Sequence, residues 1–316
     1  MYYCDTFFAF EGLERMISDL KIPEKYQPYL RIGTCSWKYD SWKGLVYNTG
    51  KSYAHHDYLT DYAKFFNTVE IDQWFWSLFP QGAKLPDSDT VKAYADSVPD
   101  DFLFTVKAPN SITLTNFYSK QLSAYKEYAN RSNPHFLDLG LLSRFLEMLE
   151  PMKARLGPIM FEFEYLNKKK MPTRKVFLGR FDAFFTQAPK EFSYAVETRN
   201  PNYLTEDLFA FLRERNLGFV MLEGYYMPPI ADVAEEHDVR TAGFSIIRLH
   251  GPDRQAIEAR TGGLWGEIVD PKDDGLRTTA SIVEENAEHR ITTFVNVNNH
   301  YEGSAPLTIQ RLLGLF

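Results

Sequence analysis

Short apolar runs that end in polar or charged residues recur along the chain, separated by stretches with helical periodicity. The run Phe192–Asn200 reads F-S-Y-A-V-E-T-R-N, so it begins apolar and ends charged. Side chains alternate between the two faces of a strand, which places Glu197 and Arg199 on one face. An acid and a base on one face at the end of an apolar strand indicate more than ordinary surface charge.

Other apolar runs end in the same way. Their polar ends carry Glu70, Lys107, Glu162 with Glu164, Arg248 with His250, and Asn296 with Asn298 and Asn299. This pattern is typical of a (β/α)8 barrel, whose interior is packed and whose active site lies at the carboxyl ends of the strands. The alternative is a set of unrelated buried ion pairs that close the mouth of the barrel.

The runs alternate with helical patterns over most of the chain. Strands are predicted at 31–36, 67–71, 102–107, 158–163, 193–198, 218–222, 244–249 and 291–297. Helices are predicted at about 55–66, 88–97, 137–156, 173–187, 205–215, 275–288 and 305–315, with a short helical turn before the seventh strand. Residues 108–135 and 250–274 are expected to be long loops. The alternation predicts an α/β fold, a TIM-type barrel of parallel strands with outer helices.

The chain is expected to hold one barrel domain, residues 31–316, after an N-terminal helical extension, residues 1–30. Apolar residues between Phe7 and Leu20 recur at near-helical spacing, which predicts an amphipathic helix in the extension. No Gly- or Ser-rich linker divides the rest. A length of 316 residues suits one large barrel with additions.

Composition narrows the classes of partner. The net charge is −7 and no basic stripe stands out, which disfavours sequence-independent binding of nucleic acid. No segment has the apolar length of a membrane span, and the N-terminus does not read as a signal peptide. The two cysteines, Cys4 and Cys35, form no metal-binding or disulfide pattern. A cytoplasmic protein with a small-molecule ligand is therefore expected, and its oligomeric state stays open.

Common catalytic and metal motifs are missing. The sequence holds no Walker A loop, no GxGxxG after a strand, no HExxH and no GxSxG. Two adjacent histidines in His55-His56-Asp57 cannot easily face one ion, so a metal site is not expected there. His250 differs, because it leaves a strand on the same face as Arg248 and is a candidate for the site.

Aromatic residues gather in the first two loops that follow strands. Trp37, Trp42, Trp74 and Trp76 lie there, together with Tyr39. One interpretation is hydrophobic packing of the loops. The other is a stacking platform for a sugar ring or a base.

Several ordered blocks of the sequence resemble the DUF72 (YecE-like) family. They are I-G-T-C-S-W-x-Y-x-x-W-x-G-x-x-Y ending at Tyr47, F-N-T-V-E-I at 66–71, F-x-F-x-x-K-A-P at 102–109, Leu156-Gly157-Pro158, A-V-E-x-R at 195–199, I-R-L-H-G at 247–251, and N-N-x-x-x-G-x-A at 298–305. The resemblance covers nearly everything after residue 30. It implies a TIM-barrel-like fold and leaves the activity open, because the family's function is uncharacterised.

The chain departs from the family pattern at several positions. The family usually has Ser-Gly where Cys35-Ser36 stand, and Thr-Phe-Tyr in the stretch 73–76. Leu114 stands where a histidine is common in the third loop. Residues 253–276 resemble a particular branch of the family.

The first functional hypothesis is an enzyme that acts on a small polar or anionic substrate, such as a sugar or a phosphate ester, by hydrolysis or isomerisation. Its catalytic candidates are Glu70, Glu197 and His250. Cationic side chains suit a phosphate or carboxylate, and unequal surroundings can split the pKa values of two carboxyl groups. The substrate-binding candidates are Lys107, Arg199, Arg248, Asn298, Asn299, Trp37, Tyr39, Trp42 and Trp74.

Three other hypotheses stay open. No cofactor is firmly implied, but a divalent metal such as Mg²⁺ or Mn²⁺ is possible, with Glu70, Glu162, Glu197 and His250 as candidate ligands of a hydrolase or isomerase. The protein could also be a non-catalytic binder of carbohydrate or single-stranded nucleic acid. The last alternative is a barrel whose polar mouth is only structural.

Overall fold

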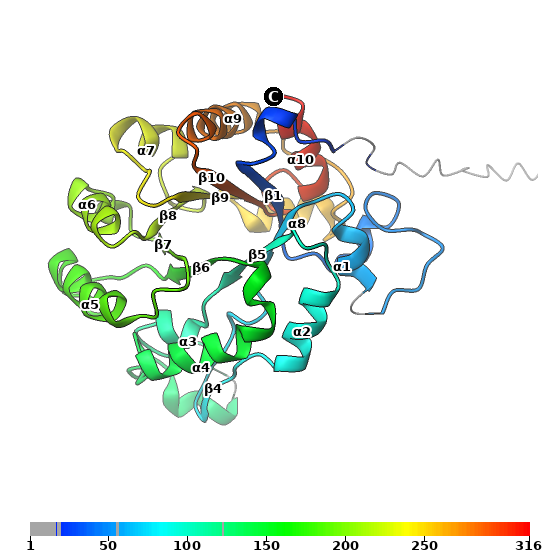
Figure 1. The fold of residues 1–316 in the computed structure, drawn as a ribbon. Helices are drawn as coiled ribbons and strands as arrows, with labels where there is room; N and C mark the ends of the chain where they lie inside the picture. The colour runs from blue at the N-terminus through cyan, green and yellow to red at the C-terminus, as the bar shows by residue number, and fades with distance from the viewer. Residues whose placement is uncertain (1–16, 18–19, 55–56, 122) are drawn as a thin grey trace, which may run out of the picture.

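The computed structural model describes residues 17, 20–54, 57–121 and 123–316, and it shows a closed barrel of parallel strands (Figure 1). The strands follow the order β1-β10-β9-β8-β7-β6-β5-β2, and β2 pairs with β1 to close the barrel. Their bounds are β1 Leu30–Cys35, β2 Thr68–Ile71, β5 Leu103–Lys107, β6 Leu156–Phe163, β7 Tyr194–Thr198, β8 Gly218–Gly224, β9 Phe244–Gly251 and β10 Thr292–Val297. The predicted TIM-type barrel is confirmed, and each predicted strand ends within two residues of its observed limits.

Helices surround the strands (Figure 1). They are α1 Asp57–Tyr62, α2 Ser88–Asp96, α4 Leu139–Leu149, α5 Arg174–Gln187, α6 Glu206–Glu214, α7 Ile230–Glu236, α9 Asp273–Glu288 and α10 Ala305–Leu313. Polar side chains fix several of their starts, because they accept bonds from the free backbone N–H groups of the first turn. Asp87, Asp138 and Thr173 do so for α2, α4 and α5.

The loops contain more structure than the sequence predicted. Helix α8, Arg254–Thr261, lies in the stretch expected to be a loop; Asp253 caps its start and Gly262 ends it at a φ of 61°. A short helix α3, Asn110–Thr113, and a 3-10 segment Ser123–Tyr128 lie within 108–135. A small hairpin, β3 Leu78–Phe79 with β4 Gly82–Ala83, follows β2. Local caps and turns build these pieces, and periodicity does not reveal them.

One long predicted helix is divided in the structure. The helix expected at 137–156 is α4 followed by a 3-10 segment, Glu150–Arg155, because Pro151 cannot continue the α-helical bonding. Further 3-10 turns are Glu24–Tyr26, Asp40–Trp42 and Pro201–Tyr203. The amphipathic helix predicted in the extension lies almost wholly outside the described residues. Within them, no helix is long and apolar enough to cross a membrane.

The barrel interior is apolar at its lower end and polar toward its mouth. Met160, Ala195, Val220, Ile246 and Phe294 form one apolar cluster from five neighbouring strands. Two residues further along each strand, the inward positions of β6, β7, β9 and β10 hold Glu162, Glu197, Arg248 and Asn296. The parallel strands therefore deliver their polar side chains at one level, at the carboxyl end of the barrel.

Candidate active site at the mouth of the barrel

A cavity of about 1040 Å³ opens at the carboxyl ends of the strands. Its walls combine charged side chains, aromatic rings and two histidines: Cys35, Tyr39, Glu70, Asp72, Phe75, Trp76, Lys107, Glu162, Tyr165, Arg199, Pro201, Asn202, Tyr225, Tyr226, Met227, Arg248, His250, Arg254, Asn298 and His300. This is where a TIM barrel carries its active site. The cavity is large enough for a drug-sized or disaccharide-sized molecule.

Arg248 lies at the floor of the cavity, with 2% of its side chain exposed, and it is bound by carboxylates. Its Nε lies 2.8 Å from Oε2 of Glu70, and its Nη2 lies 2.6 Å from Oε1 of the same residue. Its Nη1 donates to Glu197 and, over 3.2 Å, to Glu162. Four of the five N–H groups of the guanidinium are thus used inside the protein.

Glu162 is held on one oxygen by three cations. Its Oε2 lies 2.9 Å from Nζ of Lys107, 3.1 Å from Nη2 of Arg199 and 3.2 Å from Nη1 of Arg248. None of the hydrogen bonds or ion pairs among the described residues involves its Oε1. The side chain is 17% exposed and lines the cavity, so this second oxygen is the one available to a ligand.

Strand register brings these groups together. Glu162 of β6 stands opposite Glu197 of β7, and Arg248 of β9 stands opposite Asn296 of β10. A nearby register shift between β8 and β9 accompanies a close backbone approach. There Gly224 has a φ of 137°, and a Cβ on it would lie 2.3 Å from a backbone oxygen of Gly251. Only glycine fits at this position.

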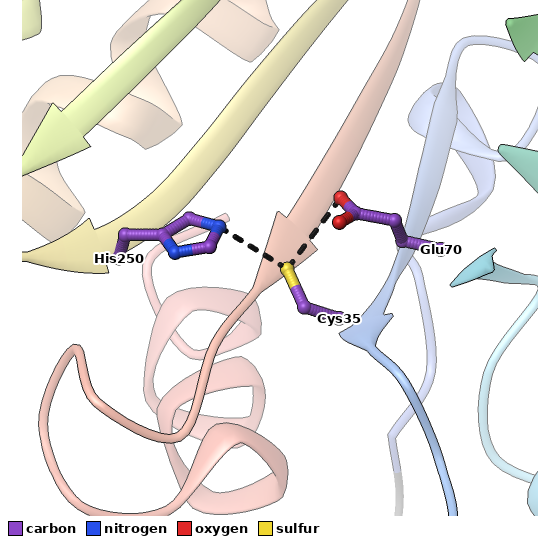
Figure 2. Close-up of side chains that lie close together, drawn as sticks. All are labelled: Cys35, Glu70 and His250. Carbon is purple, nitrogen blue, oxygen red and sulfur yellow. Dashed lines mark hydrogen bonds between the residues drawn. The ribbon is translucent and has the colours of Figure 1, made fainter. Parts of the chain in front are cut away.

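A thiol, a carboxylate and an imidazole lie close together (Figure 2). Cys35 ends β1 opposite Glu70 of β2, and its Sγ lies 3.6 Å from Oε2 of Glu70. The same Sγ lies 3.5 Å from Nε2 of His250. The other ring nitrogen, Nδ1, lies 3.2 Å from the hydroxyl of Tyr225, which follows Gly224 in the left-handed conformation with a φ of 54°.

The ion pairs decide the charges in this cluster. Burial acts to raise the pKa of Glu162, but the charges of Lys107, Arg199 and Arg248 outweigh burial and hold that pKa well below its ordinary value. Burial acts to lower the pKa of Arg248, and Glu197 and Glu70 overcome it, so the pKa lies well above the ordinary value. Glu162 is therefore a carboxylate and Arg248 a cation at neutral pH.

The thiol and the imidazole are both neutral at neutral pH. Burial raises the pKa of the Cys35 thiol well above its usual range, and the charge of Glu70 adds to this. Burial also holds the pKa of His250 well below its usual value, and Arg248 and Arg199 lower it further. His250 was predicted as a catalytic residue. The low pKa favours the neutral imidazole, and the catalytic role of His250 stays a prediction.

Asp72 is a cavity residue that the sequence analysis missed. It lines the cavity, is half-buried and forms no ion pair with any described residue. Burial raises its pKa and Glu70 adds to the rise, while Lys107 and Arg248 partly offset them. The signal was present in the sequence, because Asp72 lies two residues after Glu70 and so shares its face of the strand.

The tryptophans expected to stack on a ligand are buried instead. Trp37 and Trp74 pack on Tyr94, with ring centroids 5.1 and 6.0 Å away, and Trp42 packs on Tyr39 at 4.6 Å. None of Trp37, Trp42 and Trp74 lines the cavity, so their placement as substrate-binding residues is corrected: they are loop packing.

Other aromatic residues border the cavity in their place. Trp76, Tyr165 and Tyr226 line it, and their side chains are 62%, 59% and 95% exposed. Trp76 belongs to the predicted aromatic cluster. Tyr165 follows β6 and Tyr226 follows β8. They were not predicted, because the loops after these strands contain no cluster of tryptophans.

All of the remaining predicted site residues except Asn299 lie at the mouth of the barrel. Glu70, Lys107, Glu197, Arg199 and Arg248 are brought together at one end of the barrel through the ion pairs they share. Tyr39, His250 and Asn298 line the cavity beside them. Asn299 does not: it is buried, and its Oδ1 accepts a bond from the backbone N–H of Ala305 at the start of α10. The catalytic and binding roles of those in the cavity stay predictions.

The predicted oxygen-rich metal site has a cation at its centre. Glu70, Glu162 and Glu197 all bind Arg248, and this guanidinium takes the place that a divalent ion would need. His250 lies near Glu70 but in a different set of ligands, with Cys35. Of the pair His55-His56, both residues lie outside the described part of the chain.

The comparisons with known proteins agree with this fold. Residues 31–316 match the family described as "Protein of unknown function DUF72". A DUF72 family protein from Thermotoga maritima has a similar structure, with a TM-score of 0.62 and 22% identity over 91% of this chain and 98% of that one. One from Enterococcus faecalis gives 0.56 and 18% over the same shares. No curated protein matches the chain.

Proposed function

Because the chain belongs to the DUF72 family, whose function is unknown, we propose a function from its own cavity: an enzyme that acts on a small polar substrate, a sugar or sugar derivative, by acid–base catalysis. The main support for this proposal is the arrangement around the Glu162 carboxylate. Three cations hold one of its oxygens, and the other oxygen is left to the cavity. A carboxylate fixed in this way is preorganised for a ligand.

Asp72 and Glu162 have complementary surroundings. Asp72 has no cationic partner at ion-pair distance, and Glu162 has three. Carboxyl groups in such unequal surroundings divide the work, one donating a proton and one staying ionised. Cleavage of a glycosidic bond uses this division, because the leaving oxygen takes a proton while positive charge develops on the sugar ring. We therefore assign the acid role to Asp72 and the stabilising carboxylate to Glu162.

The charge balance favours a neutral polyhydroxyl substrate. Four carboxyl groups, Glu70, Asp72, Glu162 and Glu197, gather with three cations, Lys107, Arg199 and Arg248; a fourth cation, Arg254, lines the cavity but pairs with Glu258. An anionic substrate would have to compete with these carboxylates for the cations. Sugar hydroxyl groups can instead donate to carboxylates, while the faces of Trp76 and Tyr226 offer apolar contact to a sugar ring.

One observation favours a phosphate ester as second candidate. The Nε of Arg199 is buried and has no hydrogen-bond partner among the described residues. The side chain lines the cavity, and its guanidinium lies 4.4 Å from the ring of Tyr225. An N–H group without a partner in this position suits a phosphate oxygen.

A paired substrate panel tests the proposal. The wild-type protein is assayed for cleavage of chromogenic glycosides and short oligosaccharides, with sugar phosphates as the second arm. We expect turnover of a neutral glycoside that Asp72→Asn and Glu162→Gln both abolish, with Glu235→Gln, an exposed glutamate on α7, as the matched control. Turnover confined to sugar phosphates would favour the second candidate. Binding of sugars without turnover of any arm would contradict the enzymatic proposal.

A further inference from the structure

Cys35, Glu70 and His250 present three different donor atoms to one another at the floor of the cavity (Figure 2). We propose that Sγ of Cys35, a carboxylate oxygen of Glu70 and Nε2 of His250 form a binding site for a zinc-like divalent ion. This inference is independent of the substrate proposed above, because it concerns binding of the ion alone.

The donor spacing fits a tetrahedral zinc site. Zinc binds sulfur at about 2.3 Å and nitrogen or oxygen at about 2.0–2.2 Å, so a tetrahedral ion separates sulfur from either neighbour by about 3.6 Å. In the structure Sγ lies 3.5 Å from Nε2 and 3.6 Å from Oε2. All three donor atoms lie within 4.8 Å of one another. The sulfur therefore already stands at the distance from both neighbours that a tetrahedral ion requires.

The donor set also selects the kind of ion. A thiolate with an imidazole and one carboxylate suits Zn²⁺, whereas Mg²⁺ and Mn²⁺ prefer oxygen ligands. This set differs from the four-residue set predicted from the sequence, because Cys35 replaces Glu162 and Glu197. Glu162 and Glu197 do not belong to the group of donors that lie within 4.8 Å of one another.

Neighbouring residues hold two of the ligands in place. Tyr225 lies 3.2 Å from Nδ1 of His250, so its oxygen can accept the ring proton and leave Nε2 free for the ion. Arg248 holds both oxygens of Glu70, at 2.8 and 2.6 Å. Its positive charge opposes a second cation, but Glu197 also binds it and compensates that charge.

All three ligands line the cavity, so a fourth position is open to it. Catalytic zinc sites have this form, with three protein ligands and one position for water or substrate. Coordination breaks the S–H bond of Cys35 and forms a sulfur–metal bond, and the proton leaves to the solvent. The site would thus supply a metal-bound water or bind a substrate oxygen beside Glu162.

Titration with Co²⁺ tests the site through a signal that only a thiolate ligand gives. The sequence has two cysteines, so Cys4→Ser leaves Cys35 as the sole thiol. We expect this variant, freed of metal by a chelator, to bind one Co²⁺ with a sulfur-to-metal charge-transfer band in the near ultraviolet. The double variant Cys4→Ser, Cys35→Ser should lose the band completely, and excess Zn²⁺ should displace the bound Co²⁺.

Histidine and tyrosine variants complete the test. In the Cys4→Ser background, His250→Gln should weaken Co²⁺ binding. The control variant His289→Gln, which changes an exposed histidine after α9, should not weaken it. Tyr225→Phe should weaken it about 10–100-fold, as loss of an outer partner does. Circular dichroism verifies that each variant folds. A folded Cys4→Ser protein without a thiolate band would overturn the proposal, and so would a Cys35→Ser or His250→Gln variant that binds Co²⁺ as tightly as the Cys4→Ser protein does.

Discussion

Two pairs of carboxyl groups lie at the same end of the barrel and differ in what surrounds them. The first, which we call the buried pair, is Glu70 and Glu197; both bind Arg248, and their side chains are no more than 1% exposed. The second, the cavity pair, is Asp72 and Glu162; both line the cavity, as Glu70 also does, but Asp72 and Oε1 of Glu162 form no ion pair among the described residues. The buried pair neutralises a cation inside the protein, whereas the cavity pair keeps oxygens that a substrate can reach.

This difference shows that a charged residue at a strand end is not by itself a catalytic residue. All four carboxyl groups follow the same rule of apolar strand and polar end. What separates them is whether an oxygen is left over: both oxygens of Glu70 and of Glu197 lie in ion pairs, whereas only Oε2 of Glu162 does and Asp72 forms none among the described residues. The two pairs should therefore differ in stability, in pH dependence and in binding.

The largest effect is expected from Arg248→Met. The substitution leaves Glu70 buried without its cation and Glu197 with Arg199 alone, and loss of one partner of a buried ion pair typically costs about 3–5 kcal/mol. Urea unfolding would measure the loss, with Arg180→Met on the surface of α5 as control. Equal unfolding free energies for the two variants would show that the buried pair does not depend on Arg248.

The cavity pair should appear in the pH dependence of stability. The pKa of Glu162 is held well below its ordinary value of 4.5, so its ionised form stabilises the folded state above that value. As the pH falls below about 4.5, the unfolded chain takes up a proton before the folded one does, and this stabilisation is lost. Urea unfolding of wild type and Glu162→Gln should therefore show a gap at neutral pH that closes in acid. A gap that stays constant down to pH 3 would contradict the assignment.

The two groups of aromatic residues should differ in the same way, the exposed ones in binding and the buried ones in stability. Trp76→Ala should change the unfolding free energy by no more than about 0.5 kcal/mol, because the ring is exposed. It should weaken substrate binding by about 2–10-fold if the ring stacks on a sugar. Trp42→Ala removes a fully buried ring and should cost about 3–5 kcal/mol with no specific effect on binding. KM and thermal melts of both variants test this, and an unchanged KM for Trp76→Ala would remove the stacking role.

The sequence predicted the barrel well because the barrel depends on local patterns. Each strand carries its own apolar run, and the alternation of strand and helix dictates a parallel sheet. Helix α8 was missed because few apolar residues lie on its buried face. Its limits are set instead by the cap at Asp253 and by Gly262. Local periodicity could not report those features as a helix.

The site was predicted less completely, because its parts depend on contacts between distant strands. Convergence of Glu70, Glu197 and Arg248 followed from the strand-end rule. Trp37 and Trp42 are buried in loop packing and do not line the cavity. Their placement depends on the path of a loop, which hydrophobic periodicity does not specify. Asp72 could have been predicted from its spacing to Glu70. The meeting of Cys35 with His250 could not, because it joins residues 215 positions apart.

The comparison of the two carboxyl pairs is tested most directly by Asp72→Asn and Glu197→Gln, measured side by side. Both substitutions replace a carboxyl group by an amide of nearly the same shape. Each variant is unfolded in urea and assayed with the glycoside that the wild-type protein cleaves. We predict that Asp72→Asn keeps the unfolding free energy within about 1 kcal/mol and abolishes turnover, whereas Glu197→Gln loses several times more stability. Full turnover by Asp72→Asn, or an equal loss of stability in both variants, would contradict the division of the site into a buried pair and a cavity pair.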